Sequence, residues 1–105
     1  MITPDGGSET SMLDKIQEDV KLASRHIEVL RTVAQQQPIG IIKLSELLSV
    51  PQHRIRYSLR VLEGSGYIRA SSAGAMVTPK AKEMFRHLND DIDDIIRIVT
   101  MMKQP

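Results

Sequence analysis

The chain has 105 residues, 41% of them hydrophobic and 26% charged, with a formal net charge of +1, which suits one small domain or one domain with helical extensions. It contains no cysteine, which excludes disulfides and thiolate metal sites and fits a reducing cytoplasm. No apolar run approaches the roughly 18 residues that a membrane span needs, and no signal peptide is visible, so we expect a cytoplasmic protein without membrane contact.

The small net charge hides an uneven distribution. Residues 1–42 carry four Lys or Arg and six Asp or Glu, whereas residues 43–69 carry five and two. Residues 70–105 carry five of each sign. The basic excess in the middle indicates a nucleic-acid contact there.

The N-terminal region predicts a tail followed by one long helix. Residues 1–10 are polar and we expect them to be disordered, and a helix over 11–37 follows, with Ser11 as its cap. Its apolar or small residues recur in steps of three and four, a heptad seam formed by Leu13, Ile16, Val20, Ala23, Ile27, Leu30 and Ala34. Pro38 ends the helix, and a break at Ser24 into two helices stays open.

The segment 38–78 predicts a helix-turn-helix. Residues 39–42 form either a small strand or the approach to the next helix. Leu44, Leu47 and Leu48 predict a short amphipathic helix at about 43–49. A turn leads into a second helix over 51–64, with Pro51 at its first position.

The second helix has two different faces. Ile55, Leu59 and Leu62 form an apolar stripe, while the other side carries cations, a tyrosine and a histidine. Such a helix suits the major groove of DNA, which is wide enough for a helix and walled by phosphates.

A short hairpin and a last helix complete the chain. Residues 67–71 and 75–78 predict two strands around a turn at 72–74. Thr78-Pro79 is a strong helix start, so we expect a helix over 79–105. It repeats the heptad spacing with Ala81, Phe85, Leu88, Ile92, Ile95, Val99 and Met102.

The stretch from Leu44 to Ile68 resembles the helix-turn-helix of prokaryotic winged-helix regulators of the ArsR and MarR type, and especially small archaeal regulators of that fold. The match is carried by the pattern Leu-x-x-Leu-Glu-x-x-Gly-Tyr-Ile over residues 59–68. The resemblance implies a mainly helical fold with a small β-hairpin wing, flanked by long N- and C-terminal helices. It also implies DNA binding in transcription regulation. Two departures are Ser49, where the family often has glycine, and a wing tip without Lys or Arg.

The predicted function is a homodimeric DNA-binding regulator that reads double-stranded DNA through residues 51–64. The candidate DNA-contacting residues are Gln52, His53, Arg54, Arg56, Tyr57, Arg60, Lys43 and Arg69. The candidate dimer interface consists of Leu13, Ile16, Val20, Phe85, Leu88, Ile92, Ile95, Val99 and Met102. The terminal helices 11–37 and 79–105 would carry this interface, and whether they pair within or between chains stays open.

Other functions are weaker predictions. His87, Asp90, Asp91 and Asp94 share one helical face, but an acidic exposed face is the usual outcome there, so we expect no metal and no cofactor. No catalytic motif is present, so we expect no enzyme. The alternatives are a winged helix used for protein–protein contact in a larger assembly, or a dimerisation domain whose terminal helices are the functional surface.

Overall fold

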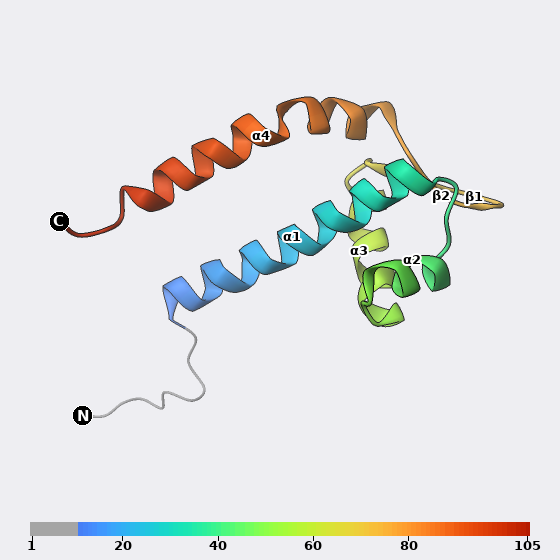
Figure 1. Ribbon diagram of the computed structural model, residues 1–105, viewed down its shortest axis with the longest axis horizontal. Helices are drawn as coiled ribbons and strands as arrows, with labels where there is room; N and C mark the ends of the chain where they lie inside the picture. The colour runs from blue at the N-terminus through green and yellow to red at the C-terminus, as the bar shows by residue number, and fades with distance from the viewer. Residues whose placement is uncertain (1–10) are drawn as a thin grey trace.

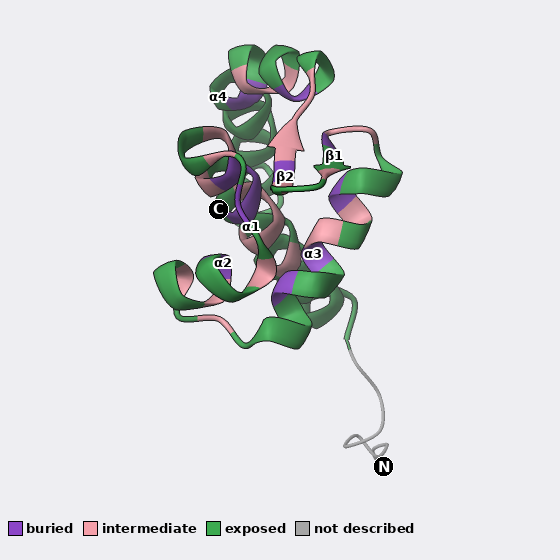
Figure 2. Cartoon of the chain, turned by 90° about the vertical axis from the view of Figure 1, so that its right-hand side faces the viewer, coloured by how far each residue is buried: buried purple, intermediate pink, exposed green. Residues whose placement is uncertain are grey.

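The computed structural model describes residues 11–105, so the predicted tail at 1–10 lies outside the described residues. In this part of the chain, a two-stranded hairpin projects at one end of a group of helices (Figure 1). The elements are α1 (Met12–Gln36), α2 (Ile41–Leu48), α3 (Gln52–Gly64), β1 (Ile68–Ser71), β2 (Gly74–Val77) and α4 (Pro79–Thr100). Helix α1 runs through the middle, with α2 and α3 on one side and α4 on the other (Figures 1 and 2). The predicted fold class, a winged helix-turn-helix between two long helices, is confirmed.

One aliphatic core lies where the C-terminal half of α1 meets α2, α3 and the hairpin (Figure 2). Its buried members are Val29, Leu30, Val33, Ile39, Leu44, Ile55, Leu62, Ile68, Ala75 and Ala81. By contrast, residues 12–20 of α1 and 91–100 of α4 are exposed throughout, as are residues 101–105 after α4. The two long helices therefore extend beyond the core, and the molecule measures 57 × 31 × 22 Å.

Helix α1 is continuous, which resolves the open question at Ser24. Ser11 caps it, because its Oγ accepts a hydrogen bond from the backbone N–H of Asp14 at 3.0 Å. The helix ends at Gln36, before Pro38, as the sequence predicts. None of the helices in residues 11–105 is both long enough and apolar enough to cross a membrane.

The turn between α2 and α3 depends on Ser49. This residue is left-handed at φ 54° and ψ 43°, a conformation that glycine adopts more easily. The Ser45 hydroxyl supports the turn by donating to the carbonyl of Val50 at 2.6 Å. The sequence placed Pro51 inside the second helix, but Pro51 is the N-cap and α3 begins at Gln52. Helix α2 also begins earlier than predicted, at Ile41.

The hairpin is a wing that is tied to the core by a third segment. Strands β1 and β2 pair antiparallel, and Ile39 forms a bridge with Ala75 through hydrogen bonds of 2.7 and 3.3 Å. The sequence left open whether residues 39–42 form a strand or lead into the next helix. In the structure Ile39 forms a one-residue bridge, and α2 begins at Ile41. Gly74 is required here, because its φ is 134° and a Cβ would lie 2.6 Å from the Ile39 backbone.

Helix α4 begins as predicted, with Thr78 as cap and Pro79 at the first position. Thr78 Oγ accepts from the N–H of Ala81 at 3.3 Å and donates to the carbonyl of Gly66 at 2.6 Å. The first turns of α4 lie on the core, where Phe85 is half-buried and Leu88 is buried. These two residues of the predicted dimer interface therefore pack within their own chain. After Leu88 the helix leaves the core.

Candidate nucleic-acid interface

Helix α3 buries one side and exposes the other. Ile55, Ser58 and Leu62 are buried, and the exposed side carries the predicted contact residues. These are Gln52, His53, Arg54, Arg56, Tyr57 and Arg60. Helix α2 lies before it and contributes the exposed Lys43. The structure thus brings seven of the eight predicted DNA-contacting residues to α2 and α3, on the side of α1 away from α4 (Figure 1).

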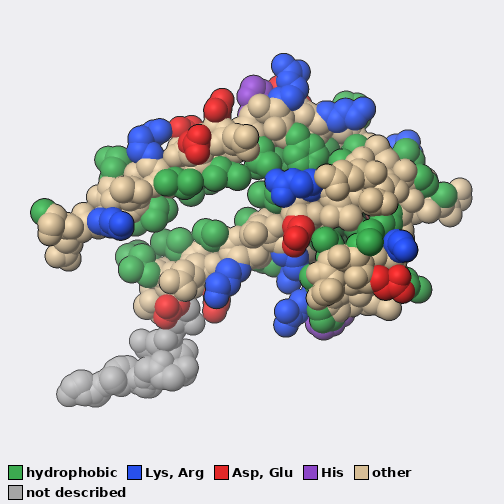
Figure 3. Space-filling view, viewed as in Figure 1, with side chains coloured by type: hydrophobic (Ala, Val, Ile, Leu, Met, Phe, Trp, Pro, Cys, Tyr) green, Lys and Arg blue, Asp and Glu red, His purple; other side chains and the backbone are tan. Residues whose placement is uncertain are grey.

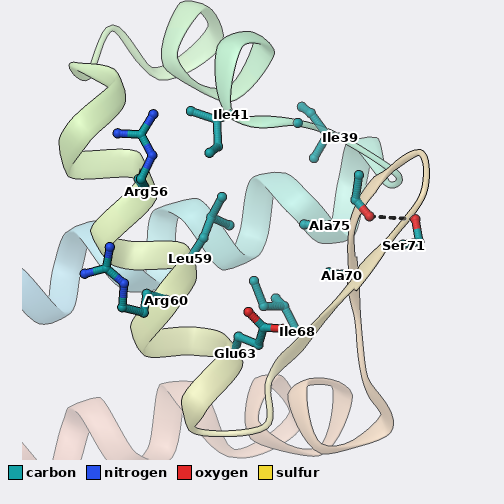
Figure 4. A pocket seen from close by; sticks show the side chains of 12 residues that line it. Ile39, Ile41, Arg56, Leu59, Arg60, Glu63, Ile68, Ala70, Ser71 and Ala75 are labelled. Atoms are coloured by element: carbon teal, nitrogen blue, oxygen red, sulfur yellow. Dashed lines mark hydrogen bonds between the residues drawn. The ribbon is translucent and has the colours of Figure 1, made fainter.

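Arg56 and Arg60 lie on the edge of α3 that faces the wing. They border a groove of about 460 Å³ between α3, the wing and the segment 39–41. Figure 4 shows apolar side chains, among them Ile39, Leu59 and Ile68, lining this groove, while both arginines extend from α3 at its edge. No carboxylate of residues 11–105 forms a salt bridge with either arginine. Both guanidinium groups are therefore free to bind phosphates or guanine edges.

The opposite edge of α3 faces α1 and contains a polar contact that the sequence did not reveal. The fully buried Ser58 Oγ accepts from Arg25 Nε at 3.1 Å and lies 2.8 Å from His26 Nδ1. The His26 ring also packs near Tyr57, with ring centroids 5.9 Å apart. Tyr57 therefore packs near a side chain of α1. The only sequence signal was a serine between Ile55 and Leu62 on the apolar stripe.

His26 has a lowered pKa. Burial is the main cause, and the positive charge of Arg25 adds to it. A neutral imidazole is consistent with the contact, because Nδ1 can then accept from the Ser58 hydroxyl while Ser58 Oγ accepts from Arg25. Protonation would place a second cation beside Arg25. The site therefore favours neutral His26.

The wing offers little charge. Arg69 on β1 is exposed and its guanidinium lies 3.7 Å from Met76 Sδ. At the tip, Ser71 Oγ donates to the Gly74 carbonyl at 2.7 Å and accepts from the N–H of Ala73 at 3.2 Å. The Ser71 hydroxyl is therefore occupied by the turn, and Arg69 is the cation that the wing strands present.

An apolar groove separates α1 from the distal half of α4. It has a volume of about 470 Å³ and is lined mostly by small or aliphatic side chains. The lining residues are Val20, Ala23, Ser24, Ile27, Glu28, Arg31, Ile92, Ile95 and Ile96. Figure 3 shows the hydrophobic side chains of the two helices facing each other across this gap. The apolar stripes continue past the groove to the exposed Leu13 and Ile16 on α1, to Val99 on α4 and to Met102 just after α4.

The acidic side chains of α4 include two that pair with neighbours on the same helix. His87 Nε2 lies 2.8 Å from Glu83 Oε2, and Asp94 pairs with Arg97 at 2.9 Å. Among residues 11–105, no group of three His, Asp or Glu side chains is placed to hold a metal ion.

The fold is similar to one found in a transcription factor. The activation domain of the phage T4 transcription factor MotA superimposes with a TM-score of 0.58 and 16% sequence identity. The match covers 80% of this chain and 94% of that domain. No family model matches the sequence, and no curated protein matches it. The resemblance to ArsR- and MarR-type regulators stays a prediction; what the comparison establishes is a fold shared with a transcription-factor domain.

Proposed function

We propose that this protein is a DNA-binding transcriptional regulator that inserts α3 into the major groove. The proposal rests on the exposed side of α3, where Arg54, Arg56 and Arg60 project without a carboxylate partner among residues 11–105. An arginine fork matches both phosphate oxygens and the guanine edge. Gln52 and His53 lie in the first turn of α3, where helices of this kind meet base edges.

We further propose that two copies bind together, joined by α1 and α4. The apolar surface formed by this groove and the stripes beyond it extends along several helical turns. A surface of this length exceeds what a small ligand would cover and suits the helices of a second copy. The interface would consist of Leu13, Ile16, Val20, Ile92, Ile95, Val99 and Met102. A two-fold dimer would present two copies of α3, as palindromic sites require.

The experiment is a salt series with duplex DNA. The double variant Arg56→Ala with Arg60→Ala should weaken binding and flatten the plot of log affinity against log salt by up to about 1.8, because each lost phosphate contact removes about 0.9. The control Lys82→Ala with Lys103→Ala removes the same charge from α4 and the residues after it, and should change little. Wild-type protein that fails to bind duplex DNA even at low salt would overturn the proposal.

A second candidate is protein contact through the same side of the molecule. The groove between α3 and the wing favours it, because an apolar floor beside Arg56 and Arg60 suits a peptide with apolar and acidic side chains. The likeness to a domain described as an activation domain also supports it. This function predicts little DNA binding at any salt, so the same series separates the two candidates.

A further inference from the structure

Two further cations lie on α1, close to Arg54 of α3. Lys21 and Arg25 are one turn apart on α1, and Arg54 belongs to the first turn of α3. The three line one shallow depression, together with Leu22 and Glu18. We call Lys21, Arg25 and Arg54 the α1 patch. It unites two segments that lie about 30 residues apart in the sequence.

The α1 patch is positively charged and not neutralised by ion pairs. The salt bridges of residues 11–105 join Lys15 to Asp19, Glu83 to Arg86 and His87, and Asp94 to Arg97. None involves the patch. Glu18, which also lines the depression, offsets one of the three charges, so an excess of two positive charges remains and attracts anions.

Arg25 is held in place before any ligand binds. Its Nε donates to Ser58 Oγ at 3.1 Å, and Ser58 is completely buried in α3. A long side chain that is already ordered loses less rotamer freedom when it contacts a phosphate. Arg25 therefore differs from an ordinary surface cation.

The α1 patch and the apolar groove lie on opposite sides of α1. Glu18, Leu22 and Arg25 follow the spacing i, i+4 and i+7, whereas Val20 and Ile27 of the groove lie roughly half a turn away. Figure 3 shows this division, with Lys and Arg side chains along the lower side of α1 and hydrophobic side chains along its upper side. A dimer formed through the groove thus leaves the patch accessible.

The position of the patch determines its ligand. A helix about 10–12 Å across fills a major groove about 12 Å wide, so phosphates flank α3 on both sides. Helix α1 packs against one flank of α3, next to Arg54. We propose that Lys21 and Arg25, together with Arg54, bind phosphates of the DNA strand on that flank and fix how α3 lies in the groove. This inference rests on the proposed DNA binding.

The test measures duplex DNA affinity of the full chain between low and moderate salt. The variant Lys21→Gln with Arg25→Gln should flatten the salt slope by about 1.8 and weaken binding at 0.1 M salt by roughly tenfold or more, since two phosphate contacts are lost. The matched control, Lys82→Gln with Lys103→Gln, should stay close to wild type. Circular dichroism verifies that both variants are folded.

A charge change of the opposite sign makes the test independent of damage to the fold. Glu18→Gln removes the carboxylate that lines the depression and should raise the affinity for DNA roughly two- to fivefold. If wild type binds DNA while Lys21→Gln with Arg25→Gln behaves like its control, phosphate binding by the α1 patch is refuted. DNA binding through α3 would then still stand. If Glu18→Gln leaves the affinity unchanged or lowers it, the patch is overturned as well. If wild type does not bind, the proposed function itself fails.

Discussion

Replacing Ile95 with alanine tests the proposed dimer, because this side chain lies in the proposed interface and is exposed in the single chain. Ile95 lines the groove between α1 and α4 and is 55% exposed in the single chain. Burying a whole isoleucine side chain stabilises by roughly 1.5–3 kcal/mol, so the exposed part that alanine would lack amounts to about 1 kcal/mol per copy. A two-fold dimer counts this loss twice, about 2 kcal/mol, which weakens association roughly 30-fold.

Sedimentation equilibrium over a wide range of protein concentrations measures this dissociation constant. Ile42→Ala is the matched control, because Ile42 is 63% exposed on α2 and lies outside the groove between α1 and α4. It should leave the dimer constant unchanged. The proposed dimer is refuted if the wild-type chain sediments as a single copy at every concentration, or if the two variants weaken association equally.

Three further predictions concern stability. The lowered pKa of His26 means that the unfolded chain takes up a proton first as the pH falls, so the stability that neutral His26 provides is complete above its ordinary pKa of 6.5 and is lost below it. The melting temperature should drop between pH 7.5 and 5.5, and His26→Gln should reduce that drop; an identical drop in the variant would contradict the assignment. Gly74→Ala should cost about 2–3 kcal/mol in denaturant unfolding, because its Cβ meets the Ile39 backbone. Its control is Gly64→Ala, which should be neutral or stabilising because nothing lies within 4 Å of the added Cβ. Thr78→Ala should cost about 1–2 kcal/mol because the helix cap and the bond to the wing base are both lost, and equal midpoints for variant and wild type in urea would count against this.

The order of helices and strands could be predicted because local signals repeat along the chain. Ser11 and Thr78 both cap their helices, as their short polar side chains ahead of apolar periodicity indicate. Gly66 follows α3 with φ at 84°, as the predicted end of that helix requires. The boundaries of α2 and α3 were less accurate, since Ile41 and Pro51 occupy positions where local preference alone allows more than one start.

The surroundings of the candidate site were less accessible from the sequence. The contact of Ser58 with Arg25 and His26 joins residues more than 30 positions apart, and no local pattern encodes such a separation. The α1 patch is also absent from the sequence-based prediction, because Lys21 and Arg25 lie in a segment where acidic residues outnumber basic ones. Only the packing of α1 on α3 brings them next to Arg54.

By itself, the sequence determined the winged helix-turn-helix, because turn residues, caps and apolar spacing act over a few positions. It also determined that α3 has a cationic side, since helical periodicity alone separates Arg56 and Arg60 from Ile55 and Leu62. Only the tertiary structure decided how the two heptad seams are used. Phe85 and Leu88 pack within the chain because the first turns of α4 lie on the core, whereas Ile95 and Val99 remain exposed because α4 diverges from α1 beyond it.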